Sequence, residues 1–195
     1  MIQNKKDYYY YLQADKEALD IKRKSPRPIV DDIWKFQRLL RKLEYTVNCK
    51  NGKIAKFYIL LLKYRFHKFS RLLGFDIPIN VFGPGLSIAH RGTIVVNGGA
   101  RVGANCRIHA SVNIGTGKDT STTLVPTLGN NVYIGPGAKI FGKIEVGDNV
   151  AIGANSVVNK SFESNVTIAG SPAKIINHKG SKDLLFRYET LKEKE

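Results

Sequence analysis

The chain has 195 residues, 43% of them hydrophobic, which is enough for one principal domain with an appendage. Its net charge is +15, of which residues 1–75 carry +11, so a basic appendage joins a nearly balanced domain. Cys49 and Cys106 follow no metal-ligand spacing, which argues against a disulfide framework or a metal site built on cysteine. The sequence shows neither a secretory signal nor an apolar run that could span a bilayer, so we expect a cytoplasmic protein.

Residues 1–74 are predicted to be helical. One helix is expected after Asp31–Asp32, with apolar residues at spacings of three and four up to Leu43. Asn51–Gly52 interrupts that pattern. A second helix is expected over about 53–73, where Lys and Arg alternate with apolar residues. Such a basic amphipathic helix most simply packs on its own protein or on a sister subunit, but it also suits peripheral contact with a membrane or an anionic glycan.

From about residue 78 onward, aliphatic residues recur at every sixth position, and small or aliphatic residues follow four positions later. A glycine often comes directly after the first set. The first set consists of Val96, Val102, Ile108 and Ile114, then Leu128, Ile134, Ile140, Val146, Ile152 and Val158.

A six-residue period predicts a parallel β-helix, in which each hexad supplies one short strand and one turn. Three hexads close a triangular coil with its aliphatic residues inside, and coils must stack because none can bury its own core. We therefore predict a mainly β protein whose prism covers residues 75–176. The period is broken between Ile114 and Leu128, which predicts a loop at 116–126 that leaves the prism, and residues 177–195 are expected to form a tail or short helix.

Four stretches within the prism carry a family resemblance. They are Gly83 to Val96 (GPGLSIAHRGTIVV), Ile114 to Lys118 (IGTGK), Ile134 to Gly147 (IGPGAKIFGKIEVG) and Ala169 to Ala173 (AGSPA). In these stretches the chain resembles the hexapeptide-repeat acyltransferases and, among them, the serine acetyltransferase family. Its short basic N-terminus resembles the form found in surface-polysaccharide biosynthesis. The resemblance implies a left-handed β-helix, a homotrimer with active sites between neighbouring prisms, and acetyl-CoA as co-substrate without a metal. A higher oligomer through the N-terminal helices stays open.

The resemblance assigns the chemistry to His90 and Asp76. His90 matches the family's general base, which deprotonates the acceptor hydroxyl as it attacks the thioester. Histidine suits that step because it titrates near neutral pH. Counting back by sixes from Val102 also lands on His90, where an aliphatic residue is expected. Asp76 matches the carboxylate that orients this histidine, although one residue fewer separates it from Gly83 than in the family.

For acetyl-CoA, the resemblance points to small residues and exposed amides at the ends of strands, and to lysines that could meet phosphates. Arg91 and His109 are candidates for contact with the acceptor. An exposed solvated side chain is an equally good reading of His109 and of each single lysine. The predicted cofactor contacts are Gly115, Thr116, Lys118, Gly135, Pro136, Gly153, Ala154 and Lys160, with Lys139 as a further lysine.

Two departures from the family concern the acceptor. Ala89 stands where the family has an acidic residue beside the histidine, and Leu124–Val125 stands where it has a cationic pair that helps to hold the carboxylate of serine. A desolvated carboxylate needs a charged or multidonor partner, which Leu and Val cannot supply. We therefore expect a sugar hydroxyl in capsule or O-antigen biosynthesis as acceptor, with serine O-acetylation as the alternative.

Two more distant readings remain open, and a third is not expected. A metal-dependent hydratase on the same fold needs three histidines from neighbouring coils, whereas only His90 and His109 lie within the predicted prism. The prism could also be a non-catalytic trimeric scaffold. A nucleic-acid-binding module is not expected, because the basic residues are interleaved with helix-core residues and form no known motif.

Overall fold

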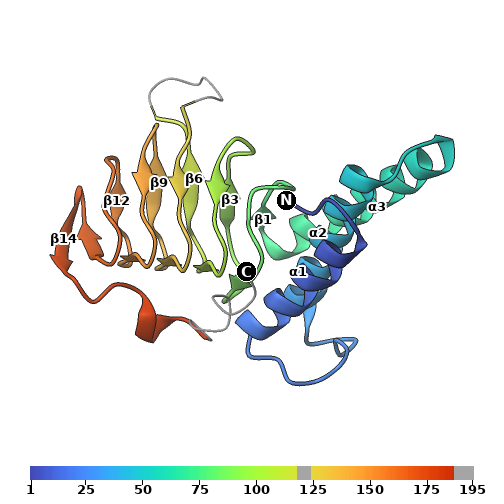
Figure 1. The fold of residues 1–195 in the computed structure, drawn as a ribbon, viewed down its shortest axis with the longest axis horizontal. Coiled ribbons are helices and arrows are strands. Elements are labelled where there is room, and N and C mark those ends of the chain that lie inside the picture. The colour runs from blue at the N-terminus through green and yellow to red at the C-terminus, as the bar shows by residue number, and fades with distance from the viewer. Residues whose placement is uncertain (118–123, 187–195) are drawn as a thin grey trace.

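The computed structural model describes residues 1–117 and 124–186. A bundle of helices stands at one end of a row of stacked β-strands, and α3 reaches farthest from them (Figure 1). In the described part of the chain, no helix is both long and apolar enough to cross a membrane.

Three helices make up the N-terminal region: α1 (Lys5–Ala18), α2 (Asp32–Cys49) and α3 (Lys53–Leu73). The last two agree with the helices predicted from the periodicity, but α1 was not singled out. The side chain of Asn4 starts α1 by accepting a hydrogen bond from the amide of Asp7. Gly74 ends α3 in the left-handed conformation, with φ of 79°, and turns the chain into the first strand.

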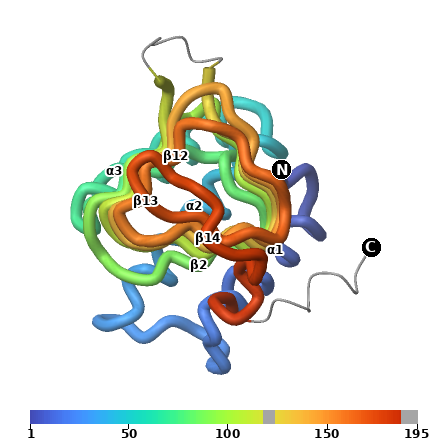
Figure 2. Tube along the Cα trace, turned by 90° about the vertical axis from the view of Figure 1, so that its left-hand side faces the viewer, coloured from blue at the N-terminus to red at the C-terminus, as the bar shows by residue number. Residues whose placement is uncertain are grey.

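The strands form three sheets that are the sides of one prism, and Figure 2 looks along the stack of coils. All pairings are parallel except the last, as the six-residue period predicts. The first sheet contains β1 (Phe75–Asp76), β3 (Ile94–Val96), β6 (Asn113–Gly115), β9 (Lys139–Phe141) and β12 (Val157–Val158). The second contains β4 (Arg101–Val102), β7 (Thr127–Leu128) and β10 (Glu145–Val146). The third contains β2 (Ser87–Ile88), β5 (Arg107–Ile108), β8 (Tyr133–Ile134), β11 (Ala151–Ile152), β13 (Thr167–Gly170) and β14 (Ala173–Asn177).

The core of the prism consists of columns of aliphatic side chains, one from each coil. On the five parallel strands of the third sheet the inward column is made of isoleucines, each at most 1% exposed: Ile88, Ile108, Ile134, Ile152 and Ile168. Burying an isoleucine contributes about 1.5–3 kcal/mol, so the column makes adjacent coils depend on each other.

One corner of the prism is held by a ladder of asparagines. Asn105, Asn131, Asn149 and Asn165 all adopt positive φ between 54° and 65°. Each of the first three donates its side-chain amide to the carbonyl oxygen of the next, at 2.7–3.0 Å. Asparagine tolerates the left-handed backbone conformation that the corner requires, and its side-chain amide can hydrogen-bond the asparagine of the next coil.

Arg41 joins the helices to the first coil. Its side chain is fully buried and uses all five N–H groups. It makes two hydrogen bonds to Asp15 (2.8 and 3.1 Å), one to Glu44, and two to the carbonyls of Phe82 and Gly83. Burial alone would lower the pKa of Arg41, but the two carboxylates outweigh burial and hold the pKa above its ordinary value.

The same junction fixes the strand that leads to His90. Asp15 accepts hydrogen bonds from the amides of Gly85 and Leu86. The buried side chain of Gln37 donates to the carbonyl of Leu86 at 2.6 Å and accepts from the amide of Ile88 at 3.4 Å. The helices therefore position the segment that ends two residues before His90.

The prism closes with a hairpin, and the chain then turns back along it. β13 and β14 are antiparallel and are joined by a turn with a cis Ser171–Pro172 bond. Beyond them, Ser181 is buried; its amide bonds the carbonyl of Asn149 and its hydroxyl bonds that of Asn131. A short 3-10 helix, η1 (Lys182–Leu184), then leads to Phe186.

Candidate active site

His90 lies in an enlarged corner of the first coil. Ile88 pairs with Ile108 and Val96 with Ile114, so eight residues separate these inward positions in the first coil and six in the second. Two extra residues are therefore accommodated at this corner, and His90 is exposed. Our expectation that His90 occupies an aliphatic position of the repeat is wrong, because counting by sixes assumes a corner of constant length.

His109 lies in the next coil at the same corner. The centroids of the His90 and His109 rings are 5.9 Å apart, and Tyr133 stands in the coil beyond, 5.1 Å from His109. The Nε2 atom of His109 is buried and has no hydrogen-bond partner among the described residues. Burial, Arg107 and His90 lower the pKa of His109 below its ordinary value, so this imidazole is neutral at neutral pH.

Arg107 is a positive charge beside these rings that the sequence patterns did not reveal. It is half-buried, and its guanidinium donates to the hydroxyl of Ser87 at 2.9 Å. The ring of Phe186, from the returning tail, covers it at 4.7 Å. Burial lowers the pKa of Arg107 below its ordinary value. Ser87, Arg107 and Tyr133 share one outward column of the third sheet, a register that only strand pairing reveals.

Asp76 and Arg91 lie at the edge of the first sheet and beside the helical region, respectively. The carboxylate of Asp76 is exposed at the end of β1 and makes no hydrogen bond or ion pair to His90 within the described chain. Arg91 is next to His90 in sequence, but its Nε is 2.6 Å from a carboxylate oxygen of Asp32 at the start of α2. One guanidinium edge of Arg91 is thus already engaged with the helical region.

The predicted cofactor residues fall into two groups. Gly135 and Gly153 follow β8 and β11 at the corner of His109, each in the next coil, and Pro136 and Ala154 come directly after them. Gly115 is the last residue of β6, at a different corner, and Thr116 follows it where the long connection begins. Lys118 lies outside the described residues.

Two of these glycines also have a packing role. A Cβ on Gly135 would lie 2.8 Å from backbone atoms of the next coil, and one on Gly153 would lie 2.9 Å from the Cβ of Ala169. A Cβ on Gly115 would meet only the Asn113 side chain, at 3.5 Å. Close stacking of coils therefore explains glycine at 135 and 153 without a ligand, whereas it does not explain Gly115.

The two predicted lysines that the structure describes, Lys139 and Lys160, have partners within the chain. Lys139 donates to the carbonyl of Ser111 at 2.6 Å, and the Lys160 ammonium lies 5.4 Å from the centroid of the Phe162 ring. No three His, Cys, Asp or Glu side chains of the described segments are grouped so that they could hold a metal ion.

Comparison with known proteins places this site in a family context. Residues 126–160 match the family model described as bacterial transferase hexapeptide (six repeats). The chain is 43% identical over 114 residues to a serine acetyltransferase of Synechococcus elongatus, covering 57% of this chain and 46% of that protein. It is 40% identical over 126 residues to the Helicobacter pylori serine acetyltransferase, covering 60% and 73% respectively. The solved structure of Brucella abortus serine acetyltransferase in complex with coenzyme A gives a TM-score of 0.69 at 26% identity, over 91% of this chain and 70% of that one.

The chain spans between 39% and 51% of the length of three of the curated relatives that it matches, but about three quarters of the Helicobacter pylori protein. The structural similarity supports the left-handed form of the β-helix that the repeat and the resemblance predict. With its repeat, its sheet topology and these matches, the chain belongs to the serine acetyltransferase-like family of hexapeptide-repeat acyltransferases.

Proposed function

We propose that this protein is an acetyl-CoA-dependent O-acetyltransferase with His90 as general base. The observation that carries this proposal is the exposed imidazole of His90 in an enlarged corner, next to a second, half-buried imidazole at 5.9 Å. The relatives are named serine acetyltransferases, and one matched structure holds coenzyme A, which supports the donor. An exposed imidazole can reach the hydroxyl of a bound acceptor and take its proton.

The proposed reaction is a direct transfer. His90 takes the proton of the acceptor hydroxyl while the hydroxyl oxygen bonds to the acetyl carbon of acetyl-CoA. The carbon–sulfur bond then breaks, and the leaving thiolate takes the proton back from the imidazolium, so free CoA and an O-acetyl ester result. His109 is kept neutral by its lowered pKa, so it places no second positive charge beside His90 when His90 becomes imidazolium.

We propose that Asp76 acts as a positioning residue for His90, as the resemblance implies. It is exposed at the end of β1, which pairs with β3, the strand that follows the enlarged corner, and it makes no competing ion pair within the described residues. Asp76→Asn should lower kcat and leave the KM for acetyl-CoA unchanged, because only the orientation and charge of the imidazole would change. Equal kcat for the two proteins would remove Asp76 from the proposal.

L-Serine is the acceptor that we propose first. The matched relatives are serine acetyltransferases, and Arg107 provides a positive charge within electrostatic reach of His109, where a carboxylate could bind. A sugar hydroxyl is the second candidate. It is favoured by Ala89 beside His90 and by the half-buried Leu124 and Val125, which offer no charged group to a carboxylate.

The test is release of free thiol from acetyl-CoA with L-serine, nucleotide sugars and oligosaccharides as parallel acceptors. His90→Asn should lower kcat about 100- to 10,000-fold, the range of general-base catalysis. His178→Asn changes an exposed histidine beyond the last strand and should leave the rate unchanged. If His90→Asn retains the parent rate, the proposed base is wrong.

A substitution of Arg107 distinguishes between the two candidate acceptors. With L-serine, Arg107→Gln should raise the KM for serine about 10- to 100-fold, since a hydrogen bond to a charged group contributes about 1.5–3 kcal/mol. The KM for acetyl-CoA should stay the same. Efficient acetylation of a sugar but not of L-serine would establish the second candidate instead.

A further inference from the structure

An apolar ridge runs along the outward face of α3. Ile54, Phe57, Leu60 and Tyr64 recur at spacings of three and four, and they are 89%, 64%, 64% and 68% exposed. The opposite face of the helix, including Leu62 and Leu73, is buried against the rest of the protein. The ridge is therefore a second apolar surface on one helix, and the fold of the single chain does not cover it.

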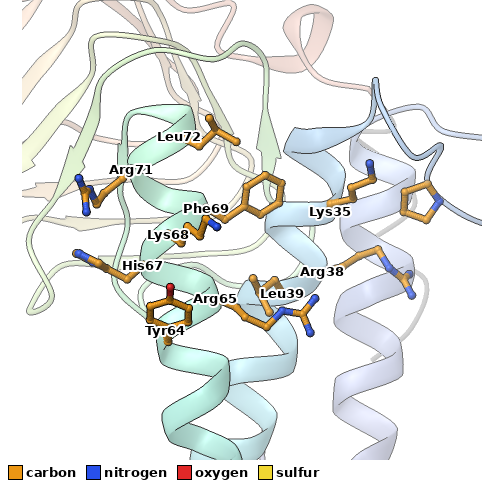
Figure 3. Close-up of a pocket in the computed structure, with 11 residues that line it drawn as sticks. Lys35, Arg38, Leu39, Tyr64, Arg65, His67, Lys68, Phe69, Arg71 and Leu72 are labelled. Atoms are coloured by element: carbon orange, nitrogen blue, oxygen red, sulfur yellow. The ribbon is translucent and has the colours of Figure 1, made fainter.

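The flanks of this ridge are basic. α3 carries Lys53, Lys56, Lys63, Arg65, Lys68 and Arg71, and its sequence contains neither Asp nor Glu. Toward its C-terminal end, a groove of about 1070 Å³ lies between α3 and α2 (Figure 3). Lys35 and Arg38 of α2 face Arg65 and Lys68 of α3 across this groove, which is open to solvent.

The apolar ridge and the basic residues of α3 together indicate the chemistry of its binding partner. A partner must accept an apolar ridge and a dense positive charge at the same time. A second copy of α3 on the ridge would bring two uniformly cationic helices together, and a soluble anionic polymer would leave the apolar residues in water. An anionic bilayer satisfies both requirements, because its headgroups attract the cations and its acyl boundary takes up Phe, Leu and Ile side chains.

We propose that α3 is a peripheral membrane-docking element that binds anionic lipid. The ridge enters the headgroup and acyl boundary, and the groove between α2 and α3 receives phosphate headgroups. α3 projects farther from the prism than the other helices (Figure 1), so the helix can lie on a surface while the prism stays clear of it. The site at His90 belongs to the prism, and docking does not depend on the acetyl-transfer activity.

The test is co-sedimentation of the full-length protein with vesicles of phosphatidylcholine alone, or with one third of the lipid replaced by phosphatidylglycerol. Binding is expected only to the anionic vesicles, and added salt should weaken it. The triple variant Arg65→Gln/Lys68→Gln/Arg71→Gln should partition about 100-fold less, given the contribution of each basic residue near such a surface.

A second variant tests the contribution of the apolar ridge. Phe57→Ser/Leu60→Ser should also lower partitioning on the order of 100-fold, because two large side chains no longer enter the lipid. Both residues are exposed, so the helical circular dichroism should be retained. The control Lys143→Gln/Lys174→Gln/Lys179→Gln removes the same charge from exposed positions outside the helical region and should bind like the parent.

Three results would overturn the proposal. One is equal binding of the parent to neutral and anionic vesicles. Another is a Phe57→Ser/Leu60→Ser variant that binds anionic vesicles as well as the parent does but has a smaller mass by light scattering, which would make the ridge a contact between copies. The third is equally strong binding to dextran sulfate and to vesicles, with neither affected by the apolar substitutions.

Discussion

Replacing Arg41 tests how the helical region and the prism are joined. Arg41→Met leaves the buried carboxylates of Asp15 and Glu44 without their cation and removes the donors to the carbonyls of Phe82 and Gly83. Removing one partner of a buried ion pair costs about 3–5 kcal/mol, which is a large part of the stability of an average domain. We expect the free energy of unfolding to fall by that amount.

Arg41→Lys should cost less than Arg41→Met but still more than about 1 kcal/mol. Lysine keeps the positive charge, but its single nitrogen has three donors and cannot serve the five acceptors that the guanidinium reaches. Lys42→Met, at the next and exposed position of α2, is the matched control and should change stability by no more than about 0.5 kcal/mol.

The assay is equilibrium urea unfolding followed by circular dichroism, with all variants at one protein concentration so that assembly affects them equally. Because Asp15 also orders the amides of Gly85 and Leu86, kcat should fall together with stability. If Arg41→Met and Lys42→Met unfold at the same urea concentration, the junction does not stabilise the protein and the reasoning fails.

Three further predictions concern the prism. Gly135→Ala should lower the free energy of unfolding by about 1–3 kcal/mol, because the added Cβ would lie 2.8 Å from the next coil. Gly115→Ala should leave stability intact and weaken acetyl-CoA binding. Equal urea midpoints for the two variants would contradict this. Unfolded His109 binds a proton near pH 6.5 and folded His109 only at lower pH, so stability should decline as the pH falls below about 6.5, and His109→Asn should flatten that decline; an NMR titration placing its pKa at or above 6.5 would refute the sign. Burial raises the pKa of the Cys106 thiol, so an aromatic disulfide reagent should modify Cys49 alone in the native protein, and rapid modification of both would count against that.

The sequence predicted the prism well because its core repeats. Inward positions such as Ile134 and Ile152 must be aliphatic in every coil, so one physical requirement appears many times in the sequence. α1 was harder to predict, since its polar face and its four consecutive tyrosines give a weak periodicity. Asp15 is paired with Arg41, 26 residues away, and such a contact leaves no local pattern.

The candidate site was predictable only in part, for a related reason. The resemblance pointed to His90, and its role stays a proposal. The six-residue register wrongly predicted that the His90 side chain takes an aliphatic position, because the first coil has a longer corner. Arg107 and Tyr133 stayed unnoticed because outward positions of the repeat accept any residue type. Their proximity to His109 depends on strand pairing between coils, which chain order does not display.

The longer corner at His90 has a consequence for how this scaffold can change. Residues that fill the prism are constrained by every neighbouring coil, but the two additional residues at this corner contribute nothing to the stacked columns on either side. A catalytic group on these additional residues is therefore independent of the packing that holds the coils together. We expect that substitutions beside His90, at Ala89 and Arg91, can change the acceptor of the proposed reaction while the stack of coils stays the same. Gly92 is not free to change in this way, because its φ is 128° and an added Cβ would lie 3.1 Å from the Cβ of Ala110.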